Sequence, residues 1–367
     1  MIGRALLRGV SAAVAIMAAA GTAVACSAPT PTISPGSFTT APPVQPTAVP
    51  TYWPAPSPVP RPSPPGMASI GEYLHAVQLA TRDHLHVWIE TELTARWLNG
   101  PASFRAGIQR AAFLANRPGV TGIKIADELG YQDGLTTPAQ IRQFLLDTSR
   151  ALHAAAPHKL ILVDMVLPQL GCLPGHQPAG SVAAACAAQA QKAYPQLALP
   201  EVGSYLRLHA INVLDVSTGL LTSGQYASLG TSINAAQLAA WQEMKRLGWT
   251  KLATLQARKA LAHPGKFPGG VSQAEADMRT YVDIPLSAGA GAVDIWTWHQ
   301  HYEGAMYRLL NPGLKPNALW TALAQQHRDH HVLYTHMSPT SVEGGLGTDL
   351  ARIATVFSDV FLPAGTG

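Results

Sequence analysis

The chain has 367 residues, of which 47% are hydrophobic and 13% are charged, and its formal net charge is +4. This apolar content excludes a chain that is disordered throughout, and the slight, scattered positive charge gives no reason to expect a nucleic-acid partner. Three cysteines are too few for a small fold held together by disulfides, and the length allows one large domain or two medium ones.

Residues 1–26 have the features of an export signal. Arg4 and Arg8 precede a run of small, apolar residues that ends at Ala25 and Cys26. A small residue directly before a cysteine at this place resembles the lipobox of bacterial lipoproteins, in which the cysteine becomes the lipidated N-terminus. The resemblance implies that Cys26 anchors the protein to the outer face of the cell membrane. Ordinary cleavage near Ala25 would instead give a secreted protein.

Residues 27–66 are predicted to form a disordered linker. The segment contains 14 of the 30 prolines and a single charged residue, Arg61. Proline favours the extended polyproline II conformation at ~3.1 Å per residue, so this segment can reach on the order of 100 Å. We therefore predict a tether between the anchor and one folded domain, which comprises residues 67–367.

From residue 67 onward, short apolar runs alternate with segments of helical periodicity. The predicted strands are 86–92, 122–128, 160–165, 211–216, 251–257 and 292–298, with 331–336 as a seventh candidate. The predicted helices are 70–81, 102–116, 138–155, 183–193, 234–247, 272–288 and 348–360, with N-terminal caps near Thr137 and Ser272. This alternation predicts right-handed βαβ units and a parallel sheet.

The C-terminal ends of the predicted strands favour a closed barrel over an open sheet. No glycine-rich phosphate-binding motif follows any strand, whereas acidic, amide or aromatic residues recur at the strand ends. These residues are Glu90, Glu92, Asp127, Glu128, Asp164, Asp215, Gln256, Trp296 and Trp298. Because (β/α)8 barrels place their functional residues at this end, we predict a TIM-type barrel. Only six strands are clear, so either the barrel is irregular or incomplete, or further strands escape the sequence pattern.

Alternation along the strands predicts which side chains point into the barrel. Lys124 faces the interior in strand 122–128, and Asp294, Trp296 and Trp298 do so in strand 292–298. A single buried charge is costly, so we predict that Lys124 and Asp294 form a buried pair that neutralises both.

Two strands resemble those of retaining glycoside hydrolases with a TIM barrel. Segment 122–128 (GIKIADE) resembles their fourth strand, which ends in a glutamate that acts as acid and base. Segment 293–298 (VDIWTW) resembles their last strand, which often ends in a tryptophan at a sugar subsite. The resemblance implies that the clear strands are the third to the eighth. It also implies that Glu128 donates a proton during hydrolysis of a cell-surface or extracellular polysaccharide, without a cofactor.

Cleavage of an acetal also needs a carboxylate that faces the developing oxocarbenium ion. In the resembling families this residue ends the seventh strand, where the chain has Gln256. The candidates for the second carboxylate are Asp127, Glu90, Glu92, Asp164 and Asp215. The predicted substrate contacts are Trp88, Gln256, Arg258, His263, Trp296, Trp298, His299, Tyr302 and Tyr307.

Two other functions compete with hydrolysis by carboxylates. Gln256 in place of an acid would suit a barrel that binds glycans without cleaving them. A metal-dependent hydrolase is the second alternative, because His84, His86, Lys124, His209 and Asp294 resemble the ligand set of the amidohydrolase superfamily. In that superfamily the ligands follow the strands, whereas these histidines precede theirs. His299, His301 and Glu303 form a further candidate zinc motif.

Cys172 and Cys186 remain if Cys26 carries a lipid. They are 14 residues apart, and in an exported protein such a pair can oxidise to close a loop. We predict a disulfide, with two free buried thiols as the alternative.

Overall fold

The structure, a computed structural model, describes residues 68–172, 181–302 and 304–364. The export signal, the lipidation of Cys26 and the proline-rich linker lie outside these residues and stay predictions. Among the helices in the described ranges, none has the length and apolar character needed to cross a bilayer.

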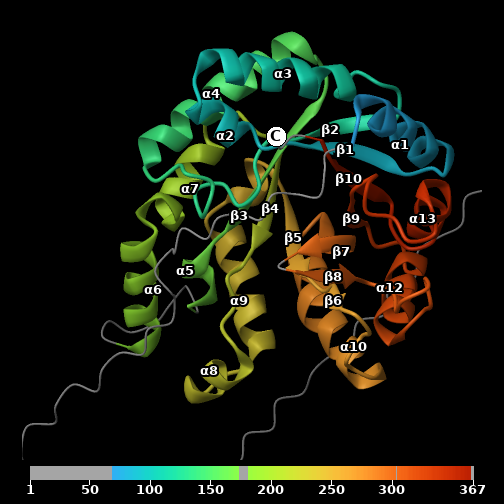
Figure 1. The fold of residues 1–367 in the computed structure, drawn as a ribbon. Helices are drawn as coiled ribbons and strands as arrows, with labels where there is room; N and C mark the ends of the chain where they lie inside the picture. Colours follow the sequence, from blue (N-terminus) through green and yellow to red (C-terminus); the bar gives the residue numbers. More distant parts are fainter. Residues whose placement is uncertain (1–67, 173–180, 303, 365–367) are drawn as a thin grey trace, which may run out of the picture. The chain divides into compact units, whose positions relative to one another are not determined.

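Eight parallel strands form a closed ring (Figure 1), which confirms the predicted TIM-type barrel. They are β1 (His86–Glu90), β2 (Val120–Lys124), β3 (Leu160–Val166), β4 (Val213–Ser217), β5 (Thr254–Ala260), β7 (Ala292–Tyr302), β9 (Leu333–Met337) and β10 (Asp359–Pro363). The ring closes because β1 pairs in parallel with both β2 and β10, while β5 pairs with β7. Two short strands, β6 (His263–Pro264) and β8 (Ala305–Arg308), extend the C-terminal end of β7 as an antiparallel addition.

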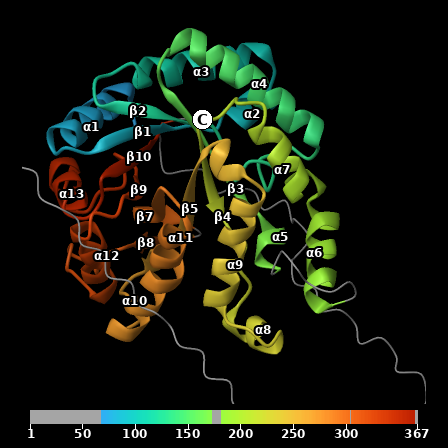
Figure 2. The same ribbon diagram turned by 180° about the vertical axis from the view of Figure 1, so that it is seen from behind.

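Helices connect the strands and lie outside the ring, as the views from the two sides show (Figures 1 and 2). They are α1 (Ile70–Arg82), α2 (Leu93–Leu98), α3 (Pro101–Ala115), α4 (Pro138–Ala155), α5 (Pro168–Gly171), α6 (Val182–Ala193), α7 (Leu199–Leu206), α8 (Ser223–Ser228), α9 (Ile233–Arg246), α10 (Val271–Met278), α11 (Ile284–Ala288), α12 (Ala318–Arg328) and α13 (Leu346–Ile353). The predicted cap at Thr137 is confirmed, because its hydroxyl accepts the Gln140 N–H at the start of α4. The predicted cap at Ser272 is wrong, since α10 already begins at Val271, after Gly270.

The strand numbers that the glycosidase resemblance implied are wrong. The six clear strands are the first to the sixth of the barrel, the seventh candidate is β9, and the eighth strand is β10. The sequence pattern assigned the start of β10 to a helix at 348–360, but α13 ends at Ile353. The first four residues of β10 are buried, and a strand buried on both faces lacks the alternation that identifies strands. Glu128 therefore follows the second strand, and Trp296 lies in the sixth.

The barrel interior is apolar toward the N-terminal ends of the strands. Its side chains come from inward-facing positions and form a buried cluster of their own: Trp88, Leu162, Val213, Ala292, Tyr334 and Phe361. Trp88 packs against Tyr334 and Phe361, and its indole N–H donates to Asp359 at 3.1 Å. This buried position does not suit the substrate contact expected of Trp88, because the ring offers no exposed face.

The predicted disulfide between Cys172 and Cys186 is confirmed, with 5.6 Å between the two Cα atoms. Cys172 directly follows α5, and Cys186 lies in α6. Both side chains are buried in a small cluster that includes Leu221 and Tyr226. The bond therefore links two short helical segments that follow β3.

The fit of Trp88 depends on the lack of a side chain at Gly122. A Cβ added there would lie 2.3 Å from Cζ3 of Trp88 and 2.5 Å from the carbonyl oxygen of Leu160. We expect Gly122→Ala to lower the free energy of unfolding by ~1–3 kcal/mol, because the core must shift to admit one carbon. Gly224→Ala in α8, where nothing lies within 4 Å, should raise it by roughly 0.5–1 kcal/mol. Denaturant unfolding of the oxidised protein measures both, and a Gly122→Ala variant as stable as the parent would contradict this account.

Candidate active site

The barrel interior is charged toward the C-terminal ends of the strands, and a buried lysine lies at the centre of this part. The Nζ atom of Lys124 is 2.7 Å from Glu90, 3.0 Å from Asp127 and 2.7 Å from Asp164. Burial by itself would lower the pKa of Lys124, but these carboxylates together raise it well above its ordinary value. Lys124 is therefore a permanent cation that contacts three acids. The pairing predicted for it was with Asp294, which instead contacts His336 and Arg258.

Arg258 brings a second cation into the same interior from β5. Its guanidinium lies 2.9 Å from Asp127 and 3.2 Å from Asp164. The same group lies 3.7 Å from Glu128 and 3.7 Å from Asp294. Sequence reasoning placed Arg258 beyond the end of its strand, but β5 continues to Ala260, so Arg258 is an inward-facing strand residue. This predicted substrate contact thus lies in the middle of the candidate site.

His336, at the end of β9, is the third cation and was missed in the sequence. Its Nδ1 lies 2.9 Å from Glu90, and its Nε2 lies 2.8 Å from Asp294. Burial lowers the pKa of His336, but the carboxylates of Asp294 and Glu90 outweigh it and raise the pKa to about 9. Burial also raises the pKa of Glu90, yet His336 and Lys124 bring it down to about 2. His336 is therefore an imidazolium that donates to both acids. Its position at the end of a candidate strand was the signal available in the sequence.

Asp215 lies on the side of the interior that these cations leave uncovered. It is fully buried on β4, level with Asp164 on β3, and neither carboxyl oxygen has a hydrogen-bond donor among the described residues. Burial, reinforced by the charges of Asp294 and Asp164, raises the pKa of Asp215 well above its ordinary value. Burial also raises the pKa of Asp164 well above its ordinary value, although Arg258 and Lys124 oppose it. A proton retained in the interior therefore resides on these deep acids.

Asp127 and Glu128 form the accessible part of the acidic group, with 32% of each side chain exposed. Burial raises the pKa of Asp127, but Lys124 and Arg258 outweigh it and hold the pKa well below its usual range. Glu128 has a left-handed backbone with φ of 52°, an uncommon conformation for this residue. Asp164 holds this turn, because its carboxylate accepts the Glu128 N–H and its carbonyl accepts the Leu129 N–H.

An aromatic cluster lies on β7 and β8 above the charged interior. The ring centroids of Trp296, Tyr302 and Tyr307 are 5.5–5.8 Å apart, and 40% of Tyr302 is exposed. Trp298 does not join them. Its ring is buried against Trp320, and its N–H donates to Asp349 at 3.0 Å. The pairing of β7 with β9 shifts register between Ile295 and His299, so simple alternation does not hold along this strand.

Several other predicted site residues lie away from the mouth of the barrel. Gln256 is buried beside Asp215, one inward position below Arg258. His299 is buried, with Nδ1 3.1 Å from the carbonyl oxygen of Ser341. These positions do not suit direct contact with a substrate. Glu92 is half-buried and directly precedes α2, beyond the end of β1.

The residues of the amidohydrolase-like pattern are split between the two ends of the barrel. His86 begins β1 and lies 3.6 Å from Asp359, which begins β10. His84 and His209 adopt positive φ values in turns that precede β1 and β4. Within the described ranges, no group of three or more His, Cys, Asp or Glu side chains is arranged to hold a metal ion. Glu303 of the second histidine motif lies outside those ranges.

No protein-family model matches the chain, and no curated protein matches it. Among solved structures, the carboxyl transferase domain of Rhizobium etli pyruvate carboxylase is similar at 12% identity with a TM-score of 0.39. The match covers 84% of this chain and 45% of that one, so this chain spans less than half of that protein. A truncated 3-deoxy-D-arabino-heptulosonate 7-phosphate synthase from Thermotoga maritima is similar at 8% identity over 76% of this chain and 74% of that one, with a TM-score of 0.37. These values are too low to indicate a function.

His336 should make the stability of the fold depend on pH. Its pKa is about 9 in the folded protein against an ordinary value of 6.5, so the folded state binds more protons between these values. The free energy of unfolding should therefore fall as pH rises from 6.5 through 9, by on the order of 3 kcal/mol. We expect the variant His336→Asn to lack this fall in denaturant unfolding measured across that range.

His75, which is exposed on α1, offers the matched control for this measurement. His75→Gln should keep the slope of the parent protein. If His336→Asn and the parent lose stability equally with rising pH, the interaction of His336 with Glu90 and Asp294 does not have the strength inferred here.

Proposed function

We propose that the protein is a glycoside hydrolase that acts on a cell-surface or extracellular polysaccharide at the mouth of the barrel, with Glu128 as proton donor. One observation carries the proposal: a single guanidinium, that of Arg258, lies between two partly exposed carboxyl groups. Asp127 is 2.9 Å from one of its nitrogens, and Glu128 is 3.7 Å from another. These contacts limit the nearest carboxyl oxygens to a separation of no more than about 9 Å, a ceiling compatible with the ~5–5.5 Å or ~6.5–9.5 Å of glycosidase pairs.

The two carboxyl groups have different surroundings, as acid and base roles require. Asp127 contacts both Lys124 and Arg258, which hold its pKa well below its usual range and keep it ionised. An ionised carboxylate can face the positive charge that develops on the sugar, as nucleophile or as base. Glu128 is held by the Asp164 turn and makes the longer contact with Arg258, and it delivers the proton to the leaving oxygen.

The aromatic cluster supports a sugar as the substrate. Trp296 is two residues beyond the buried Asp294 on the same strand, so it stands above the charged interior. The exposed area of Tyr302 adds an aromatic surface next to it. Aromatic rings provide apolar faces against which pyranose rings can pack. The predicted export and the tether from Cys26 would bring such a site to polymers outside the membrane.

Two substitutions at the mouth test the proposed hydrolysis. Glu128→Gln and Asp127→Asn keep the side-chain shape but remove the proton donor or the charge. We expect each to lower the rate of reducing-end release from the polysaccharide that the parent cleaves by ~10²–10⁴-fold. Glu275→Gln, on the exposed face of α10, is the control and should retain the parent rate.

The parent protein is first assayed against soluble glucans, mannans, galactans and arabinans. A Glu128→Gln variant as active as the parent would refute the role of Glu128. A parent that binds one of these glycans without cleaving it, with binding retained in Glu128→Gln, would identify a glycan-binding protein instead. Activity that follows the content of zinc in the purified protein would favour hydrolysis by a metal-activated water.

A further inference from the structure

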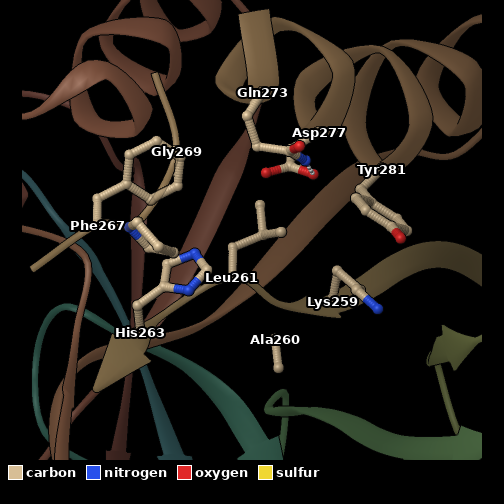
Figure 3. A pocket seen from close by; sticks show the side chains of 10 residues that line it. Lys259, Ala260, Leu261, His263, Phe267, Gly269, Gln273, Asp277 and Tyr281 are labelled. Atoms are coloured by element: carbon tan, nitrogen blue, oxygen red, sulfur yellow. Dashed lines mark hydrogen bonds between the residues drawn. The ribbon is translucent and has the colours of Figure 1, made fainter. Parts of the chain in front are cut away.

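A cavity with both apolar and polar lining residues lies outside the barrel interior. It has a volume of about 410 Å³ and lies between the end of β5, the segment that follows β6, and α10 (Figure 3). Lys259 lines it, whereas the preceding residue, Arg258, points into the barrel, because neighbouring strand residues face opposite sides. This cavity is therefore separate from the acids at the mouth. Its volume lies within the ~300–1,000 Å³ typical of small-molecule sites.

The wall of the cavity contains an unsatisfied histidine nitrogen. The Nε2 atom of His263 is buried and has no hydrogen-bond partner among the described residues. Burial lowers the pKa of His263, so its ring is neutral at pH 7, with one nitrogen that donates and one that accepts. The ring of Phe267 packs edge-on against it at 5.0 Å, and Figure 3 shows both rings at the same side of the cavity. Phe267 thus fixes the ring of His263, and the Nε2 atom of that ring has no hydrogen-bond partner among the described residues.

The opposite wall adds a few polar groups of mixed character. One oxygen of Asp277 accepts the side-chain amide of Gln273 at 2.9 Å, which leaves the other oxygen and the Gln273 carbonyl to accept further bonds. Lys259 places its ammonium 4.5 Å from the centre of the Tyr281 ring. One cation and one acid therefore line the cavity together with a neutral imidazole and an amide.

This combination selects against ligands that carry a net charge. A phosphate or carboxylate is bound by several converging N–H donors, and Asp277 would repel it. A cationic ligand would meet the ammonium of Lys259. Hydroxyl groups both donate and accept, so they match single donors and acceptors distributed around a wall. Phe267 supplies the apolar surface that the C–H face of a sugar ring needs.

We propose that this cavity binds an uncharged saccharide unit, whose hydroxyls bond to His263, Gln273 and Asp277 while its ring packs against Phe267. His263 on β6 is paired with Arg308 of β8, whereas Tyr307 of the aromatic cluster is the neighbouring residue, whose side chain points to the other face of these two strands. The cavity is therefore distinct from the aromatic cluster. This site goes beyond the proposed hydrolysis and does not require it.

The test measures binding in the Glu128→Gln protein, so that no probe is consumed. Methyl glycosides of glucose, mannose, galactose and arabinose are titrated by calorimetry, with glucuronate and inorganic phosphate as anionic probes, methylammonium as a cationic probe and alanine as a zwitterionic probe. We expect at least one methyl glycoside to bind, and His263→Ala and Gln273→Ala to weaken its Kd tenfold or more. Glu275→Gln, on the same helix but outside the cavity wall, should leave the Kd unchanged.

The proposal is overturned if no methyl glycoside binds, if a charged probe binds more tightly, or if both cavity variants keep the original Kd. Gln273 is exposed, so Gln273→Ala remains informative should His263→Ala fail to fold. Loss of binding in the cavity variants together with an inactive parent would reject the hydrolysis and leave this site standing. A parent that hydrolyses a polysaccharide, while both cavity variants keep the original Kd, would reject this site and leave the proposed hydrolysis standing.

Discussion

The pairing of the buried Lys124 ammonium with acidic side chains is the interaction on which the C-terminal half of the barrel interior depends. A buried charge is tolerated only when paired, and here the pairs form a closed circuit of ion contacts. It runs through Lys124, Glu90, His336, Asp294, Arg258, Asp127 and back to Lys124. Each cation contacts at least two acids, so the circuit draws β1, β2, β5, β7 and β9 together by charge as well as by backbone hydrogen bonds. Nearer the N-terminal ends of the strands, apolar side chains around Trp88 fill the barrel interior instead.

The same circuit separates structural acids from accessible ones. Against the effect of burial, cations inside the protein lower the pKa of Glu90 and Asp294 and keep both ionised, whereas burial raises the pKa of Asp164 and of Asp215. The chain just beyond β2 brings Asp127 and Glu128, each 32% exposed, to the mouth. Asp127 belongs to both groups, because it completes the circuit and is also partly exposed. The deep charges thus fix the geometry of the groups available for chemistry.

The sequence was sufficient for the fold class and for part of the site. Alternating strand and helix patterns identify seven of the barrel strands, and the inward position of Lys124 follows from period two. The eighth strand escaped detection because it is buried on both faces and shows no alternation. Trp298 departs from period two where β7 shifts register against β9. His336 meets Glu90 across 246 residues of sequence, a contact that ring closure creates and local patterns do not encode.

The pairing of β1 with β10 has a consequence for the order in which the chain can fold. The first barrel strand finds its second neighbour only when the segment beginning at Asp359 is present. Until then the edge of β1 remains open to pairing with other chains. Closure of the ring therefore depends on the last strand in the sequence, and the unpaired edge of β1 persists until that strand is in place.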